Sequence, residues 1–240
     1  MNVAMMQPTF LPWLGYFQLI YKSDIFVFLD DFQFSVQSYH QRNKLFVNQD
    51  QVDWYTVPIK KTNTFGVSIN KAHFDESRNW RKKLVGRLEK NYFKTPFFDN
   101  IYPLIGDIII NEKSNLSKLN IKLIKAVVKL FDWDIQWEFS SKYPSKAIRS
   151  ERVLELLKKC GAKHYYSPIG AMQYLKDDGI FPVSNLDVSF QNFYVKKYPQ
   201  KNSSGEFIPS LSVLDALFNV GPEETIKLIN NESNKWEKWK

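Results

Sequence analysis

Two adjacent carboxylates follow an apolar run near the start of the chain. Asp30 and Asp31 come directly after IFVFL at residues 25–29. A carboxylate at the end of a buried strand could bind an amine, hold Mg²⁺ or act as a general base. Because successive side chains of a strand point to opposite faces, we expect only one of the pair to face a given cleft. Helix caps and surface turns also use aspartates, so the pair alone leaves its role open.

A proline-containing loop lies upstream of this pair. Residues 7–17 read QPTFLPWLGYF, in which Pro8 and Pro12 fix φ and Gly15 allows close approach of the backbone. A stiff loop that opens onto a helix N-terminus suits an anion, because free N–H groups and the helix dipole both favour negative charge. An ordinary turn between a strand and a helix explains the same pattern. The spacing leaves both interpretations open.

A third polar group lies at His40, Gln41, Arg42 and Asn43, between aromatic segments. Arg42 can hold a carboxylate or phosphate through two parallel hydrogen bonds, and Asn43 can bond to a sugar hydroxyl or an amide. The alternative is a polar loop with one surface ion pair.

Motifs of other chemistries are absent from the sequence. No Cys/His spacing indicates zinc, so we expect no metal site. Cys160, the single cysteine, is expected to pack in the core rather than act as a nucleophile. There is no P-loop, no G-x-G-x-x-G and no G-x-S-x-G. The N-terminal segment is therefore the main candidate site.

Composition limits the class of protein. A chain of 240 residues can bury a substantial core. No apolar run approaches the ~20 residues that span a bilayer. A single cysteine excludes an intrachain disulfide and indicates a reducing compartment, so we expect a cytoplasmic protein. The formal net charge is +8, and the excess lies after residue 60. We interpret it as a solvated lysine-rich surface, because no nucleic-acid-binding motif accompanies it.

The expected elements alternate between strand and helix. Residues 1–31 form a strand–loop–helix–strand unit, and the later elements are strands at 52–59, 135–139, 164–167 and 186–190 and helices at 76–94, 114–131, 150–160, 210–219 and 223–230. This order predicts an α/β fold with a mainly parallel sheet. We expect one domain over residues 1–240, with the mostly helical residues 74–131 as an insertion or cap. In such folds ligands bind where strand C-termini and their loops converge.

The motifs resemble those of the WbqC-like family over residues 7–228. The pattern Q-P-x-x-x-P-x-x-G-Y-F with D-D-x-Q-F carries the resemblance, together with QRNKL, NYFKTPFF, SPIGAMQYL and FIPSLSVLDALFNVG. The matching positions are Gln7, Pro8, Pro12, Gly15, Tyr16, Asp30, Asp31, Gln33, Arg42, Asn43, Pro58, Tyr92, Gly170, Pro209, Ser212 and Asp215. The family often has N-R-N-R/K where this chain has Gln41-Arg42-Asn43-Lys44, a change that keeps Arg42 and Asn43.

The resemblance implies a role in bacterial O-antigen and related polysaccharide biosynthesis, and a glycyl or aminoacyl transfer to an amino-deoxy sugar. We therefore expect a transferase, or an ATP-dependent amide ligase, that forms an amide on the amino group of a nucleotide-linked deoxyamino sugar. Asp30 or Asp31 is the expected base, and Tyr16 an orienting donor. Arg42 with Lys60 is the expected anion clamp. The remaining substrate-binding residues are expected to be Gln7, Gly15, Gln33, His40, Asn43 and Asp215.

The acyl donor stays open among an aminoacyl-tRNA, an acyl carrier, and ATP with Mg²⁺ plus a free amino acid. A different class of protein, a non-catalytic subunit that binds a sugar nucleotide or glycan, suits the aromatic-rich composition equally. A third class, an RNA-binding protein, predicts RNA affinity that falls steeply with salt.

A weaker similarity is to nucleotidyltransferases with an HxGH-type loop after the first strand. Trp13 and Tyr16 stand roughly where those enzymes have histidines. The similarity therefore implies a shared scaffold with different chemistry on it.

Overall fold

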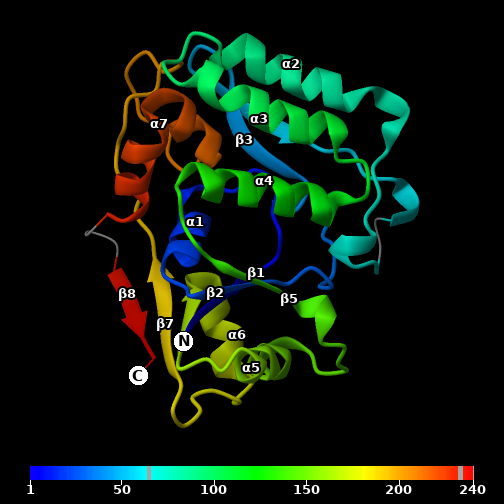
Figure 1. The fold of residues 1–240 in the computed structure, drawn as a ribbon, viewed down its shortest axis with the longest axis vertical. Coiled ribbons are helices and arrows are strands. Elements are labelled where there is room, and N and C mark those ends of the chain that lie inside the picture. Colours follow the sequence, from blue (N-terminus) through cyan, green and yellow to red (C-terminus); the bar gives the residue numbers. More distant parts are fainter. Residues whose placement is uncertain (64–65, 232–234, 240) are drawn as a thin grey trace.

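The chain folds around a six-stranded sheet (Figure 1). The computed structural model describes residues 1–63, 66–231 and 235–239. The strands lie in the order β5-β2-β1-β6-β7-β8, and the first five of these are parallel while β8 runs antiparallel to β7. Their bounds are β1 Asn2–Met6, β2 Ile25–Phe28, β5 Gln136–Phe139, β6 His164–Pro168, β7 Asp187–Asn192 and β8 Lys235–Lys238. This arrangement confirms the predicted α/β fold with a mainly parallel sheet.

Helices cover both faces of the sheet (Figure 1). Alternation along the strands divides the core: Ala4 and Phe26 pack on one side, whereas Val3 and Val27 pack on the other. The first side is covered by α1 (Leu14–Tyr21), α4 (Leu116–Leu130) and α7 (Val213–Ile229). The second side is covered by α5 (Arg149–Lys159) and α6 (Met172–Asp177).

A long excursion connects β2 to β5. It contains a separate antiparallel hairpin, β3 (Arg42–Asn48) and β4 (Gln51–Thr56), followed by α2 (Trp80–Tyr92), α3 (Phe98–Asn111) and α4. Short 3₁₀ turns η1 (Lys61–Asn63), η2 (Ile69–Lys71) and η3 (Glu76–Arg78) join the hairpin to α2. Figure 1 shows α2 and α3 stacked beyond α4, away from the sheet. The interpretation of residues 74–131 as a cap on one domain stays a prediction.

Four elements were not among those predicted individually from the sequence: β3, α3, α6 and β8. Residues 42–48 form strand β3 rather than a polar loop, because alternate residues Asn43 and Leu45 are buried under the hairpin. Helix α3 forms despite Pro103, which lies in its second turn. Strand β8 was not predicted, because its four residues carry two lysines and a glutamate. The predicted break at Gly221 is confirmed, since its φ of 75° and ψ of 175° interrupt α7.

Candidate functional site

The candidate site lies where the direction of strand connection reverses. From the adjacent strands β1 and β6 the chain builds outward on both sides, through β2 and β5 on one and β7 on the other. The carboxyl ends of such strands leave a crevice between them, which is the usual ligand position of this fold. A cavity of about 430 Å³ lies here, and we call it the crevice. Its polar and charged lining comes from Gln7, Arg149, Tyr165 and Tyr174.

Two further cavities adjoin the crevice. One has a volume of about 270 Å³, and we call it the acidic side pocket after its one carboxylate, Asp31. It shares Phe32 and Arg149 with the crevice and adds Gln33 and Arg152. The other, of about 340 Å³, shares Met6 and is lined mainly by apolar and aromatic groups. We call it the aromatic pocket, and its lining includes Thr9, Pro12, Trp13, Tyr16, Tyr39 and Asn43.

The loop between β1 and α1 is held from several sides. Asn43 Nδ2 donates to the carbonyl of Leu11 over 2.7 Å, and Asn120 Nδ2 donates to that of Pro8 over 2.9 Å. Tyr16 Oη donates to the carbonyl of Gln7 over 3.1 Å. Burial raises the pKa of Tyr16 well above its ordinary value, so the phenol stays neutral. Tyr16 and Asn43 therefore act here by positioning the loop.

His40 orients Gln7 toward the crevice. The backbone N–H of Ser35 donates to His40 Nδ1 over 3.1 Å, so the ring hydrogen lies on Nε2 and points at Gln7 Oε1, 3.0 Å away. Burial lowers the pKa of His40 to about 4, which keeps the ring neutral. The Gln7 amide nitrogen has no hydrogen-bond acceptor in the described part of the chain, and Gln7 lines the crevice. It can therefore donate to a ligand.

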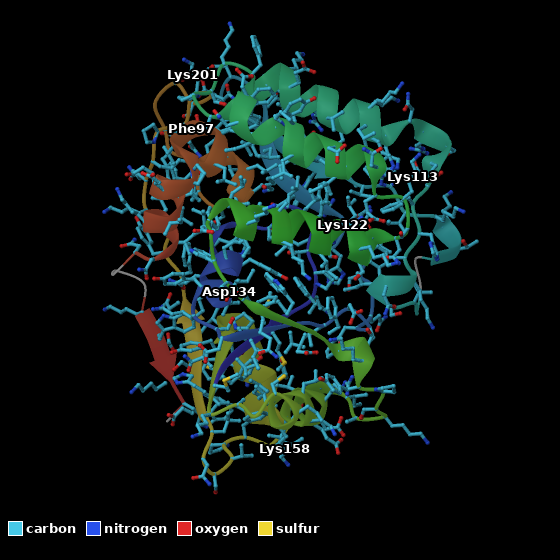
Figure 2. The ribbon with its side chains drawn as sticks, viewed as in Figure 1. Phe97, Lys113, Lys122, Asp134, Lys158 and Lys201 are labelled. Atoms are coloured by element: carbon cyan, nitrogen blue, oxygen red, sulfur yellow. The ribbon has the colours of Figure 1, made fainter. Side chains whose placement is uncertain are left out.

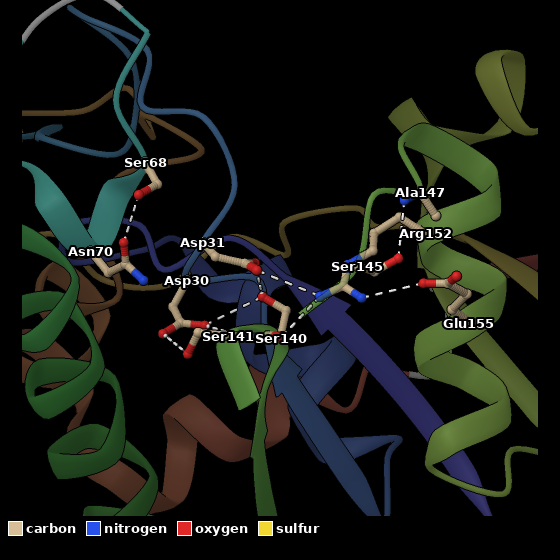
Figure 3. A network of polar contacts seen from close by, with 10 residues as sticks. All are labelled: Asp30, Asp31, Ser68, Asn70, Ser140, Ser141, Ser145, Ala147, Arg152 and Glu155. Atoms are coloured by element: carbon tan, nitrogen blue, oxygen red, sulfur yellow. Dashed lines mark hydrogen bonds and ion pairs between the residues drawn. The ribbon is translucent and has the colours of Figure 1, made fainter. Parts of the chain in front are cut away.

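Asp30 and Asp31 both reach the start of the segment after β5 (Figure 3). Asp30 accepts hydrogen bonds from the Ser141 backbone over 3.0 Å and from the Ser141 hydroxyl over 2.8 Å. Asp31 accepts from the Ser140 hydroxyl and lies 3.5 Å from Arg152. Ser140 also lies 3.3 Å from Asp30.

Of the two aspartates only Asp31 lines one of the three cavities, although strand alternation is not the reason. The strand ends at Phe28, and both residues belong to the turn that follows, so the alternation rule does not apply to them. Asp30 is buried and 8% exposed, whereas the Asp31 side chain is 32% exposed and lines the acidic side pocket. Of the two, Asp31 is the one a ligand can reach.

The structure explains why residue 15 is a glycine, which the sequence did not show. A Cβ at this position would lie 2.5 Å from the indole of Trp13. The backbone is thus approached closely by the chain's own Trp13, which forms a wall of the aromatic pocket. The Gly15 carbonyl accepts from Gln191 Nε2 over 2.7 Å.

Six of the predicted site residues line none of these three cavities: Asp30, Gly15 and His40, described above, and Arg42, Lys60 and Asp215. Arg42 stacks on Trp54, with its guanidinium 4.1 Å from the ring centroid. Lys60 is exposed beyond the hairpin. Asp215 is fully buried among Tyr92, Tyr198 and Gln200. Burial raises the pKa of the Asp215 carboxyl, and these three hydrogen bonds oppose that effect.

Comparison with known proteins identifies the family. The profile of the WbqC-like protein family matches residues 7–227. The chain belongs to the WbqC-like protein family. It is also 31% identical over 223 residues to "Uncharacterized protein Rv1507c" of Mycobacterium tuberculosis, across 92% of this chain and 95% of that protein. No solved structure matches the chain.

The match to the WbqC-like family spans every residue that lines the three cavities except Met5 and Met6, which both line the crevice. Within the described ranges no helix is long and apolar enough to cross a membrane. Nor do three His, Cys, Asp or Glu side chains gather there in a way that could hold a metal ion.

Sequence reasoning missed the two arginines that this WbqC-like protein brings to the acidic side pocket. Arg149 lines both the crevice and the acidic side pocket, and its side chain is 58% exposed although it pairs with Asp178 over 2.8 Å. Arg152, one helical turn later, is buried and donates to the Ser140 carbonyl over 2.9 Å. The sequence did carry a signal for this anion-binding position: two arginines three residues apart at the start of a helix that follows a strand.

Proposed function

We propose that this protein transfers an acyl or aminoacyl group to the amino nitrogen of a nucleotide-linked deoxyamino sugar. The observation that carries the proposal is that the crevice, which Gln7 lines, shares wall residues with the aromatic pocket on one side and with the acidic side pocket, which Asp31 lines, on the other. A transfer between two substrates needs two adjoining binding volumes with an acid–base group at their junction. Membership in the WbqC-like family supports the proposal through the aminoacyl transfer that the resemblance implies.

In the proposed reaction the sugar nitrogen attacks the acyl carbonyl carbon. A C–N bond forms, the bond from carbon to the donor's leaving group breaks, and the nitrogen loses a proton to the Asp31 carboxylate. Asp31 suits this role because it is partly exposed in its pocket. The Gln7 amide, oriented by His40, can donate to the substrate from the wall of the crevice.

Recognition of the nucleotide diphosphate falls to Arg149 in this proposal. Its side chain lies at the border of the crevice and the acidic side pocket, and the guanidinium keeps donors beyond those bonded to Asp178. The clamp of Arg42 with Lys60 expected from the sequence lies outside these cavities. Arg149 therefore replaces that pair as the expected anion-binding group.

A non-catalytic sugar-nucleotide-binding subunit is the second candidate. One observation favours it: Asp31 and Asp30 both direct oxygens at Ser140, as expected of carboxylates with a purely structural role. The same crevice would then bind a sugar nucleotide without turnover.

Asp31→Asn separates the two candidates. We would incubate the wild type and the variant with nucleotide-activated amino sugars and each class of donor, and measure the acylated product by mass spectrometry and binding by calorimetry. Transfer is expected to fall by at least 100-fold in the variant while sugar-nucleotide affinity changes less than threefold. Asp134→Asn, an exposed change labelled in Figure 2, is the matched control. A wild-type protein that binds the sugar nucleotide yet forms no product with any donor favours the binding subunit.

A further inference from the structure

A basic surface lies outside the three cavities, on α2. The helix carries Arg81, Lys82, Lys83, Arg87 and Lys90 against a single carboxylate, Glu89. Lys83, Arg87 and Lys90 are spaced by four and three residues, which places them on one stripe of the helix. Arg78 lies just before the first residue of the helix, Trp80. We call these four residues, Arg78 with the stripe, the basic face.

The basic face is joined to the β3–β4 hairpin. Arg87 donates to the Trp54 carbonyl over 2.9 Å, and its guanidinium lies 4.5 Å from the Tyr55 ring centroid. A cavity of about 330 Å³ lies between the two elements and is lined by Tyr55, Thr56, Pro58, Trp80 and three of the cations. No carboxylate is among the described residues that line it. Its charged lining is therefore cationic, with Arg78 and Lys83 beside Arg87, which also pairs with Asp53 over 3.0 Å.

Two unfilled donors support an anionic ligand there. Trp80 lines the cavity and is 5% exposed, yet its indole N–H has no hydrogen-bond partner among the described residues. A buried donor without an acceptor is costly, so a bound oxygen would stabilise it. The first turn of α2 also lacks a side-chain cap, because Asn79 makes no capping hydrogen bond.

Aromatic rings continue this surface along the outer face of the hairpin. Lys44 lies opposite Trp54, and Arg42 opposite Thr56, so these four side chains share one face. Arg42 and Lys44 both lie over the Trp54 ring, at 4.1 and 5.1 Å from its centroid, and Tyr39 contacts its edge at 5.7 Å.

Arg42 is the sharpest feature of this face. Its guanidinium has no hydrogen bond or ion pair in the described part of the chain, and its Nε is fully buried. Stacking on Trp54 thus holds in place a cation whose two terminal NH2 groups have no partner in the described part of the chain. Proteins bind single-stranded nucleic acid with this combination, since bases stack on rings while phosphates contact the neighbouring cations.

We propose that the basic face and the outer face of the hairpin bind RNA. Resting on the proposed function, we further infer that this RNA is the aminoacyl donor, because Tyr39 lies both on the RNA-binding surface and in the wall of the aromatic pocket. A charged 3′ end that stacks near Trp54 would then enter the site beside Tyr39. The phosphates upstream of that end would follow the basic face of α2.

The first test measures the affinity for fluorescein-labelled tRNA and for a 12-nucleotide single strand as a function of salt. The variant combines R78Q, K83Q and K90Q, three exposed residues. Three lost phosphate contacts should lower the slope of log affinity against log salt by about 2, and the affinity about 100-fold at 0.1 M salt. Trp54→Ala should weaken binding of the single strand about tenfold by removing the stacking platform.

The matched control removes the same charge elsewhere. K158Q, K159Q and K176Q lie on α5 and α6, on the opposite side of the molecule from α2, where Figure 2 labels Lys158. This triple variant should bind RNA within threefold of the wild type. Equal weakening by the two triple variants would show that only net charge matters, and would overturn the proposal. Binding to phosphatidylserine vesicles without binding to RNA would overturn it as well.

Sugar-nucleotide affinity and transfer from a small donor distinguish a failure of this proposal from a failure of the proposed function. The triple variant on the basic face should keep its sugar-nucleotide affinity and its transfer from a small activated acyl thioester. Loss of transfer from aminoacyl-tRNA alone supports the RNA as donor. RNA binding by the wild type without transfer from any charged tRNA would overturn the donor assignment.

Discussion

His40 Nε2 donates a hydrogen bond to Gln7 Oε1 over 3.0 Å, across 33 residues of sequence. The Ser35 backbone N–H, which donates to His40 Nδ1, decides the tautomer. The Gln7 amide nitrogen is thereby turned away from the ring, toward the crevice. A neutral histidine thus sets the direction of a donor in the candidate site.

This relationship predicts a pH-dependent stability. Burial lowers the pKa of His40 to about 4 in the folded protein, whereas the ordinary value is 6.5. When the pH is lowered from 6.5 to 4, the unfolded chain takes up a proton that the folded protein does not. The free energy of unfolding therefore decreases by ~3 kcal/mol over this range. Above pH 6.5 the residue contributes nothing to the slope.

Urea denaturation across this pH range measures the effect. His40→Gln, which can still donate to Gln7, should remove the loss of ~3 kcal/mol between pH 6.5 and 4. Parallel stability curves for the wild type and the variant would contradict the prediction.

Asp30 and Asp31 should differ in their effect on stability. Asp30 is buried and accepts two hydrogen bonds from Ser141, so Asp30→Ala should lower the free energy of unfolding by ~3 kcal/mol. Asp31 is more exposed and lies 3.5 Å from Arg152, so Asp31→Ala should cost ~1 kcal/mol. Urea denaturation measures both losses. A larger loss of stability in Asp31→Ala than in Asp30→Ala would contradict the assignment of Asp30 as the structural carboxylate.

Gly15→Ala should distort the aromatic pocket. The new methyl group would meet the Trp13 ring at 2.5 Å, and moving the indole should cost ~2 kcal/mol and weaken any ligand of that pocket. Gly86→Ala is the matched control, because nothing lies within 4 Å of its Cβ position and the residue is inside α2. That change should raise stability by ~0.5–1 kcal/mol. Thermal melts and intrinsic tryptophan fluorescence test both.

Asp215→Ala should affect folding but not the crevice. The carboxylate accepts hydrogen bonds from Tyr92, Tyr198 and Gln200, and its removal leaves three buried donors unpaired. We expect a loss of ~3 kcal/mol in the free energy of unfolding. Calorimetry below the lowered melting temperature should give an unchanged sugar-nucleotide affinity. A clear loss of affinity would place Asp215 in the site after all.

Local patterns in the sequence determined most of the fold. The apolar run before Asp30 predicted β2, and leucines at helical spacing predicted α4, because strand and helix periodicity are properties of neighbouring residues. The glycine and proline at 221–222 likewise predicted the break in α7. Family motifs in the sequence also carried the assignment to the WbqC-like family, which the profile match confirms.

The tertiary structure alone decided which polar residues meet. Asp31 contacts Ser140, 109 residues later, because β2 and β5 are neighbours in the sheet. Arg149 reaches the crevice because α5 begins at the carboxyl edge that β1 and β6 share. Strand order is set by long-range packing, which periodicity does not encode, so the sequence could place a site near Gln7 but could not choose Arg149 over Lys60.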